Sequence, residues 1–437
     1  MERLGTFKMN RELRIEKTYE YAREIYGEYG IDTEAVLNRF DTIPISIPCW
    51  QGDDVGGFER RGGGAGGGIM ATGNYPGKPR TAEELRMDME KCMEYVPGKV
   101  KINLHSSYGE DYEKDIDRDA YAPLHFKKWA AWAKDKEVGL DMNATTFGHP
   151  MAEDNLTISN PKPEVRKFWI RHMQAVREIS EYIGKEQGQP CIFNTWVQDG
   201  IKDMPADRML YRRLMLESFD EIFSAKEISP EYVYDALEPK LFGVGVESFT
   251  VGSHDFYLSY HGHARAGKIG NTIMNLDMGH FHCEESVADK ISAVMLYSDK
   301  IMAHFTRGVR WDSDHVVIND EKTNDMMREI VRCGVVDDTF FGTDYFDGSV
   351  NRVAAWTIGT RATERALLGA LLEPAHILKQ AESSGDTTKR LALMDEFRSL
   401  PVNAVWEYYC MKKGKFVGME WLEDLKQYES KVMFKRG

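Results

Sequence analysis

Long apolar runs are missing from this sequence of 437 residues. No stretch reaches the roughly 18 apolar residues that a membrane-spanning helix needs. The first 25 residues are charged and helical in pattern, without the apolar core of a secretion signal. We therefore expect a cytoplasmic protein with no membrane partner.

Paired cysteines and an excess of positive charge are missing as well. The six cysteines are scattered and form no Cys-x-x-Cys motif, so we expect reduced, mostly buried thiols rather than a disulfide framework. Acidic residues outnumber basic residues by 70 to 56, which gives a formal net charge of −14. Because such a surface repels phosphate backbones, the sequence disfavours a nucleic-acid partner.

What the sequence does contain is a regular alternation of short apolar runs and longer helical patterns, which is typical of βα units. The expected strands are 43–48, 99–105, 139–145, 190–197, 232–241, 273–279, 301–307 and 340–346. The expected helices include 81–95, 163–185, 207–225, 284–298 and 322–333. Eight strands with interleaved helices predict an α/β fold, the (β/α)8 or TIM barrel.

The chain is expected to divide into three parts. Residues 1–40 form an N-terminal helical segment, in which an amphipathic pattern over 10–38 ends near Gly27 and Gly30. Residues 41–372 form the catalytic barrel. Residues 373–437 are rich in helix formers and predict a C-terminal α-helical extension that packs between subunits.

One glycine-rich segment, residues 56–77, interrupts this pattern after the first expected strand. Gly62, Gly64 and Gly67 match G-x-G-x-x-G, but no helix follows directly, as a dinucleotide site requires. In a barrel, the segment follows the carboxyl end of a strand, where lids over active sites lie. We therefore interpret it as a flexible loop over this end of the barrel, where a lid would lie.

Polar side chains interrupt the strands of the second half of the barrel and the loop after the seventh strand. They are Glu238, Asp277, His280, His304, Asp312, Asp314 and Asp344. Alone, each has an ordinary explanation as a helix cap or a hydrogen-bonded core residue. Together they place five carboxylates at one end of the barrel, where two of them about 4 Å apart repel by roughly 4 kcal/mol at an effective dielectric of about 20. Cations that compensate this charge are the natural interpretation, and the mixed ligands suit Mg²⁺, Mn²⁺, Co²⁺ or Zn²⁺. Seven ligands indicate two cations.

Four further side chains are candidates for the same rim. Lys240 lies two residues after Glu238, on the same face of the strand, and is placed to hydrogen-bond a substrate oxygen that gains negative charge. His105 ends the second strand and is either a proton shuttle or a packing residue. Trp50 and Trp196 end strands one and four, where they either wall an apolar pocket or belong to the core.

Over most of its length the sequence resembles the L-rhamnose isomerase family. The strings that carry the resemblance are Cys49 to Asp54, Ala71 to Lys78, Asn103 to His105, Trp196 with Asp199 and Gly200, Lys240 to Gly243, Glu247 to Ser253, Asp277 to His282, Arg310 to His315, and Ala354 to Trp356. The Glu-Pro-Lys of 238–240 and the Asp-x-x-His of 277–280 also resemble the wider xylose isomerase group.

The resemblance implies a role for each candidate. The implied ligands of a structural metal are Glu238, Asp277, His304 and Asp344. Those of a catalytic metal are His280, Asp312 and Asp314, with Asp277 a candidate to be shared. Lys240 would polarise the substrate carbonyl, and His105 with Asp344 nearby would open the sugar ring. The implied substrate-binding residues are Trp50, His105, Trp196, Lys240 and Asp277. A homotetramer and two divalent cations, Mn²⁺ first, complete these expectations.

The implied activity is the interconversion of the aldose L-rhamnose and the ketose L-rhamnulose. A hydride shift between C2 and C1 is favoured, while proton transfer through an enediol stays open. The alternatives are another metal-dependent sugar isomerase or epimerase on the same barrel, a sugar-acid dehydratase, a metal-dependent nuclease and a non-catalytic sugar-binding barrel. The negative charge weighs against the nuclease.

Overall fold

The structure, a computed structural model, describes residues 2–59, 71–112, 116–152, 154–241, 247–309 and 311–436, and leaves the side chains of 2–10 and 311–313 outside that description. Within these residues, eight parallel strands close into one barrel. They are β1 (Ile45–Pro48), β2 (Val100–His105), β3 (Gly139–Asn143), β4 (Cys191–Trp196), β6 (Val233–Glu238), β8 (Thr272–Asp277), β9 (Ile301–Phe305) and β12 (Thr339–Thr343). The strand order is β1-β12-β9-β8-β6-β4-β3-β2. The predicted (β/α)8 barrel is confirmed.

The barrel strands are buried on both faces, because helices cover the outside and side chains fill the inside. Alternate residues point inward, so that Ile273, for example, shares its face with Asn275 and Asp277. Ile192, Ala236, Ile273 and Met302 form an apolar cluster inside the barrel. Polar side chains on the same inward faces follow it toward the carboxyl ends of the strands.

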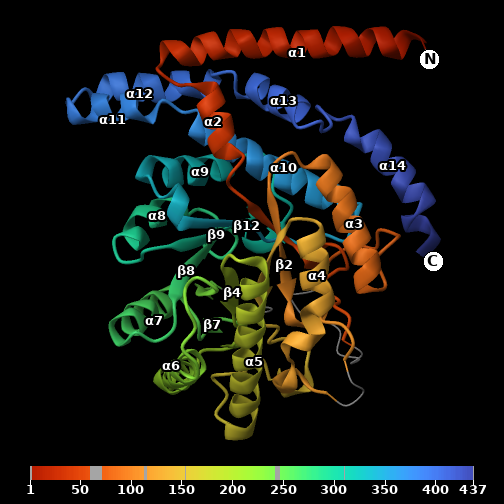
Figure 1. Ribbon diagram of the computed structural model, residues 1–437. Helices are drawn as coiled ribbons and strands as arrows, with labels where there is room; N and C mark the ends of the chain where they lie inside the picture. Colours follow the sequence, from red (N-terminus) through yellow and green to blue (C-terminus); the bar gives the residue numbers. More distant parts are fainter. Residues whose placement is uncertain are drawn as a thin grey trace.

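A helix follows each barrel strand and packs on the outside, as Figure 1 shows. These helices are α3 (Ala82–Tyr95), α4 (Lys127–Asp135), α5 (Pro163–Gln187), α6 (Arg208–Ser224), α7 (His254–Gly267), α8 (Ala288–Met295), α9 (Glu321–Cys333) and α10 (Arg352–Leu371). Thr81, Asp207 and Asp320 cap α3, α6 and α9 by accepting a hydrogen bond from a backbone N–H of the first turn.

The two ends of the chain lie together along one side of the barrel (Figure 1). The elements are α1 (Glu2–Glu28), α2 (Thr33–Phe40), α11 (Ala375–Ser383), α12 (Thr387–Glu396), α13 (Val402–Lys412) and α14 (Trp421–Lys431). Helix α1 packs against α13, where the rings of Tyr19 and Tyr408 stack with centroids 3.7 Å apart. The helical pattern predicted over 10–38 is split into two helices, because Gly30 has a φ of 75° and Asp32 caps α2.

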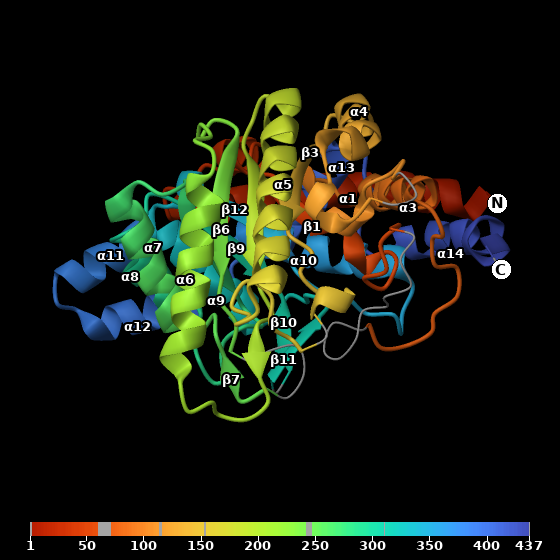
Figure 2. The ribbon, with the colours of Figure 1, turned by 90° about the horizontal axis from the view of Figure 1, so that it is seen from below.

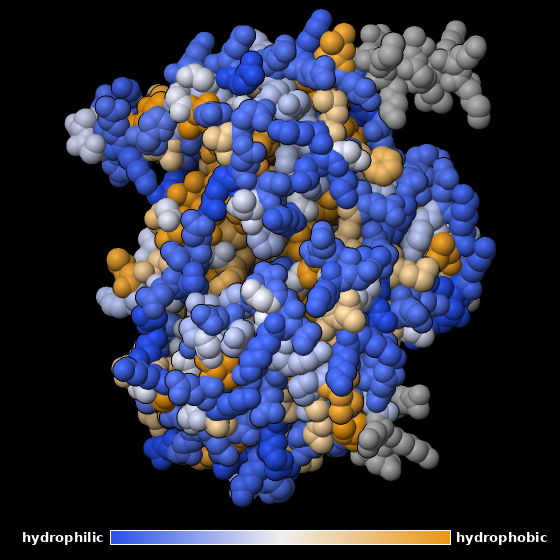
Figure 3. Space-filling model, in the orientation of Figure 1, coloured by the Kyte–Doolittle hydropathy of each residue, from blue (hydrophilic) through white to orange (hydrophobic). Residues whose placement is uncertain are grey.

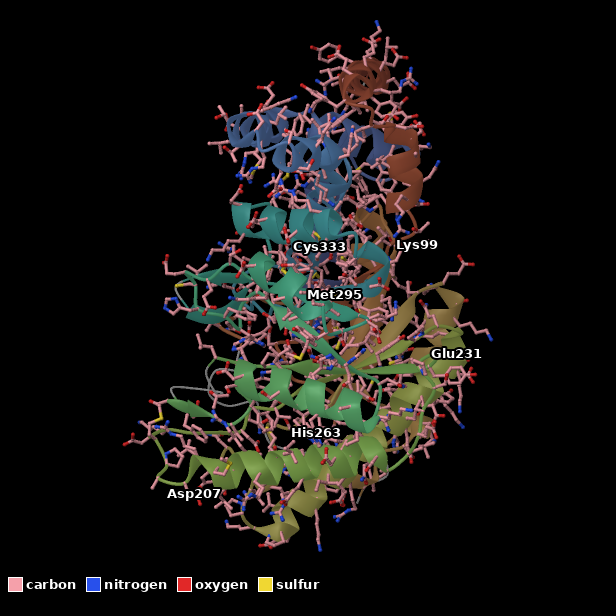
Figure 4. All side chains as sticks on the ribbon, turned by 90° about the vertical axis from the view of Figure 1, so that its left-hand side faces the viewer. Lys99, Asp207, Glu231, His263, Met295 and Cys333 are labelled. Atoms are coloured by element: carbon pink, nitrogen blue, oxygen red, sulfur yellow. The ribbon has the colours of Figure 1, made fainter. Side chains whose placement is uncertain are left out.

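Two short ribbons lie at the carboxyl ends of the barrel strands. They pair β5 (Gly200–Ile201) with β7 (Phe249–Thr250), and β10 (Arg307–Val309) with β11 (Trp311–His315). Figure 2 shows β7, β10 and β11 at its lower edge. In Figure 4, Lys99 and Glu231, which precede β2 and β6, lie on the right, whereas Asp207 at the start of α6 lies on the left. The amino and carboxyl ends of the strands are therefore on opposite sides.

The surface is mainly hydrophilic. Figure 3 shows the face that carries the amino ends of the strands, with apolar side chains gathered mostly in the hollows between polar ridges. The cysteines are free thiols, and Cys49, Cys92, Cys191 and Cys410 are buried. None of the helices in the described ranges combines the length and the apolar character of a membrane span.

Candidate active site

A first group of potential metal ligands meets at the carboxyl ends of four adjacent strands. Glu238, Asp277, His304 and Asp344 each offer an atom, and all of these atoms lie within 4.8 Å of one another. The Nδ1 atom of His304 is 3.0 Å from Oε1 of Glu238, 3.5 Å from Oδ2 of Asp277 and 3.8 Å from Oδ2 of Asp344. The four residues that the resemblance assigns to the structural metal are thus neighbours in space.

A second group shares Asp277 with the first. Asp277, His280 and Asp314 also offer atoms within 4.8 Å of one another. Nδ1 of His280 lies 3.1 Å from the carbonyl oxygen of Pro239, which only accepts hydrogen bonds, so Nδ1 carries the proton and Nε2 carries the lone pair that can bind a cation. Gly279 lies beside both carboxylates and leaves room for them: a Cβ atom there would lie 2.7 Å from Cγ2 of Thr306, 3.1 Å from Asp314 Oδ1 and 3.3 Å from Asp277 Oδ1.

Asp314 reaches this group through an unusual backbone. It lies in β11 with a φ of 37°, in the left-handed region that non-glycine residues seldom occupy. The backbone N–H of Phe346, after β12, donates to the carbonyl of Asp314 at 3.3 Å and ties the ribbon to the barrel. Strain of this kind is found where a side chain must be aimed at a functional site.

The electrostatics of the first group fit a cation. Burial opposes the charge of Glu238, but His304 lowers the pKa of Glu238 to about 2. Burial likewise disfavours a charged His304, yet Glu238 raises the pKa of His304 well above its usual value. Burial and then the charge of Asp277 raise the pKa of Asp344 well above its usual value. In the described part of the chain, no hydrogen bond satisfies the buried Oδ2 of Asp277. A positive ion among these oxygens would relieve the repulsion, and mixed carboxylate and imidazole ligands suit a divalent metal.

Both groups open into one pocket with aromatic walls. Its lining residues are Trp50, Val55, His105, Asn143, Phe147, Trp196, Glu238, Lys240, His280, Asp314, Asp344 and Phe346. The pocket encloses about 460 Å³ of empty space, part of it open to solvent. Small-molecule sites combine apolar walls with a few convergent polar groups, as this pocket does.

His105 is held among aromatic rings at the pocket wall. Its ring centroid is 4.7 Å from that of Trp50 and 5.4 Å from that of Phe147. Nδ1 lies 3.3 Å from the hydroxyl of Thr145. Burial lowers the pKa of His105 to about 3, so the imidazole is neutral at neutral pH. Asp344, its implied partner, lines the same pocket and accepts a hydrogen bond from the indole of Trp50 at 3.0 Å.

Lys240 lines the pocket beside the ligand groups, two residues after the end of β6. It is only 9% exposed, and its Nζ lies over the ring of Trp196, 4.7 Å from the centroid. A lysine that lines the same pocket as Asp344 and Glu238 can donate a hydrogen bond to a substrate oxygen that develops negative charge. Trp196 is therefore both a wall of the pocket and a platform for the lysine.

Two expectations fall partly or wholly outside what the structure describes. The side chain of Asp312 lies outside the described residues, so its assignment to the second group stays a prediction. Of the predicted mobile loop, residues 60–70 lie outside as well, and its role as a lid stays a prediction. Its described ends are anchored: Glu59 pairs with Arg118, and the hydroxyl of Tyr75 donates to Glu429 at 2.5 Å.

Four pocket residues were not anticipated from the sequence. They are Val55, Asn143, Phe147 and Phe346. Asn143 is the only one with a visible signal, because it interrupts an apolar strand at its carboxyl end, as Glu238 does. The other three are apolar residues in loops, and their composition does not distinguish a pocket wall from the core.

The chain was compared with known proteins. Residues 13–436 match the family model described as L-rhamnose isomerase (RhaA). The L-rhamnose isomerase of Salmonella gallinarum is 47% identical over 423 residues, which cover 97% of this chain and 99% of that protein. The L-rhamnose isomerase of Escherichia coli O127:H6 is 47% identical over 424 residues, with the same coverage. A solved L-ribulose 3-epimerase covers 78% of this chain and 98% of its own, with 12% identity and a TM-score of 0.46.

The family match carries more weight than the structural likeness. It spans nearly the whole chain, from the N-terminal helix to the last helices. The named relatives share almost half of their residues with this chain over nearly their full length. The chain is therefore a member of the L-rhamnose isomerase family.

Proposed function

We propose that this chain is an aldose–ketose isomerase that interconverts L-rhamnose and L-rhamnulose. The observation that carries the proposal is the meeting of two ligand groups, which share Asp277, beside the buried Lys240 in one aromatic-walled pocket. The names of the relatives supply the substrate.

Two divalent cations belong to the proposal, with Mn²⁺ preferred over Zn²⁺, Co²⁺ and Mg²⁺. Glu238, Asp277, His304 and Asp344 would hold one of them. Asp277, His280 and Asp314, together with Asp312, would hold the other. When bound, such cations act as Lewis acids that stabilise negative charge on sugar oxygens.

The residues of the chain prepare the sugar for this chemistry. His105, neutral because it is buried, assists ring opening through Nε2, since its Nδ1 faces Thr145. Asp344 is its partner in this step, and the indole of Trp50 holds the carboxylate in place. Trp50, Phe147 and Trp196 cover the apolar face of the sugar and exclude water.

In the open-chain sugar, Lys240 donates a hydrogen bond to the oxygen that gains negative charge during hydrogen transfer. Asp312 or Asp314 orients a water molecule that carries a proton between O2 and O1. The hydrogen at C2 moves to C1 as a hydride.

The test is a panel of aldoses incubated with metal-stripped protein to which single cations are added back. We expect ketose to form from L-rhamnose with Mn²⁺ and none to form without a metal. If no L-rhamnulose forms with any of the metals and another aldose is converted instead, that aldose is the substrate and the proposal of L-rhamnose is wrong. Equal turnover without metal would refute the cation requirement.

We also propose that the enzyme is a cytoplasmic homotetramer, divided into segments 1–40, 41–372 and 373–437 as the sequence predicts. Light scattering coupled to gel filtration should give four times the chain mass. A monomer or dimer at micromolar concentration would contradict this assembly without affecting the proposed reaction.

A further inference from the structure

Four asparagines form a hydrogen-bonded row across the inside of the barrel, at the floor of the pocket. Asn103, Asn143, Asn194 and Asn275 come from β2, β3, β4 and β8, and each is at most 3% exposed. Nδ2 of Asn143 donates to Oδ1 of Asn103 at 2.6 Å, and Nδ2 of Asn194 donates to Oδ1 of Asn143 at 2.8 Å. Nδ2 of Asn275 donates to Oδ1 of Asn194 at 3.1 Å.

This row is unusual for a barrel interior, where branched apolar side chains normally fill the layers. A buried amide group without hydrogen bonds costs about 1–3 kcal/mol. The hydrogen bonds of the row satisfy both groups of Asn143 and of Asn194, whereas Nδ2 of Asn103 and Oδ1 of Asn275 have no hydrogen-bond partner among the described residues. The row runs in one direction, because each amide donates toward the neighbour on the β2 side. Since the donors are aligned, the hydrogen bonds polarise one another.

The row ends at the first ligand group. The second N–H of Asn194 donates to Oε2 of Glu238. Because an amide nitrogen has two hydrogens, Asn194 has none left after binding Asn143 and Glu238. Its Oδ1 is held by Asn275, so both ends of the amide are fixed and it cannot turn over without losing hydrogen bonds on both sides.

The consequence for Glu238 is geometric. With Oε2 held by Asn194, the other oxygen, Oε1, faces the first group and lies 3.0 Å from Nδ1 of His304. Asn275 also contacts His304, because Nδ2 of Asn275 lies 3.0 Å from Nδ1 of His304. A carboxylate with one oxygen fixed by a buried donor presents the other in one orientation.

We infer that Asn194 is a positioning residue that orients Glu238 for a divalent cation, and that its two neighbours in the row, Asn143 and Asn275, hold Asn194 in place. The inference rests on the proposed metal-dependent function and adds to it a determinant of cation affinity outside the ligand groups. Its chemistry is a neutral donor that fixes a ligand without adding charge to an already acidic site.

The experiment is a titration of metal-stripped protein with Co²⁺. Calorimetry measures the affinity, and the visible absorption of the bound ion reports its ligand geometry. In Asn194→Leu, a side chain of similar size removes the donor to Glu238. We expect the Co²⁺ affinity of the site that contains Glu238 to fall about 10- to 100-fold. This is the usual effect of removing a hydrogen-bond partner from a metal ligand. We also expect a changed Co²⁺ absorption spectrum.

The matched control is Asn103→Leu, at the far end of the row. Asn103 touches no ligand in the described part of the chain, but the change removes a buried hydrogen bond from the same layer. We expect a lower melting temperature in both variants and a nearly wild-type Co²⁺ affinity and spectrum in this one only. If Asn194→Leu does not fold, Asn194→Ser, which is too short to reach Glu238, takes its place with the same expectation.

Two results would overturn the inference alone: wild-type affinity and spectrum in the Asn194 variants, or an equal loss of affinity in Asn103→Leu. Failure of the wild-type protein itself to bind Co²⁺ is a separate outcome, because it would overturn the metal-dependent function together with the inference.

Discussion

The indole nitrogen of Trp50 donates a hydrogen bond to Oδ1 of Asp344 at 3.0 Å, and the same Trp50 ring packs against His105. One side chain just after the first strand thus links Asp344, a candidate ligand that follows the last strand, with the expected ring-opening residue. Sequence reasoning offered Trp50 as a pocket wall or a core residue. The structure shows that Trp50 also makes a polar contact, the hydrogen bond to Asp344.

The Trp50–Asp344 contact is tested by Trp50→Phe, which keeps an aromatic wall and removes the donor. Hydrogen bonds to charged groups contribute about 1.5–3 kcal/mol, so we expect kcat/KM to fall at least about tenfold. Steady-state kinetics with L-rhamnose measure the effect. Trp196→Phe is the matched control, because the indole nitrogen of Trp196 is buried without a hydrogen bond in the described structure. An equal loss in both variants would show that only the wall matters.

Lys240→Met should remove most of the turnover and leave the cation sites intact. The expected loss in kcat is about 100- to 1000-fold, as for other donors that stabilise a developing negative charge. Because Lys240 is not a ligand, Co²⁺ binding and the melting temperature should stay close to wild type. A rate near that of the wild type would remove Lys240 from the mechanism.

Treatment with a chelator should abolish activity, and Mn²⁺ or Co²⁺ should restore it. The melting temperature should also fall on chelation, because a cation that binds only the folded chain stabilises it. Thermal denaturation with and without added Mn²⁺ measures the shift. Glu238→Gln, which removes one ligand charge, should show a smaller Mn²⁺-dependent shift than the wild type, and an unchanged shift would contradict the assignment of Glu238.

Glu364 in α10 makes stability depend on pH. Burial, opposed by Arg361, raises its pKa from 4.5 to about 8. The folded chain therefore keeps a proton that the unfolded chain releases between these pH values, so this residue lowers stability as the pH rises. In Glu364→Gln, the stability relative to wild type should grow by up to about 1.4 kcal/mol per pH unit over that range. Urea denaturation from pH 5 to 8 measures the difference, and a constant difference would contradict it.

The route of hydrogen transfer is open to an isotope experiment. L-Rhamnose carrying deuterium at C2 should give L-rhamnulose that retains the label at C1, because a hydride does not exchange with water. Mass spectrometry of the product in ordinary water measures the retention. Loss of the label to solvent would favour proton transfer through an enediol.

The fold was predictable because strand period and helix length leave strong signals. Each expected strand overlaps a barrel strand, but several were drawn too long at the carboxyl end. The run 232–241, for instance, corresponds to a strand that ends at Glu238. The backbone leaves the sheet there so that Lys240 can turn into the pocket, and the apolar pattern does not record that departure.

The site was predictable where a ligand sits on a strand and less so where a loop delivers it. Asp277 and His304 follow from the period of their strands. Asp314 reaches the same place only through a left-handed backbone, which no hydrophobic pattern encodes. The asparagine row was missed because a single amide in a strand resembles any other polar interruption, and only the barrel shows that four of them meet.

Asp277 belongs to both ligand groups, and this has a thermodynamic consequence. A carboxylate common to two sites ties their occupancies together, since filling either one changes the charge and orientation that the other meets. By reciprocity, the first ion must alter the affinity for the second by the same factor as the reverse. Cation-binding curves for this enzyme should therefore be fitted with an interaction constant, and a substitution at Asp277 should change that constant and weaken both binding steps.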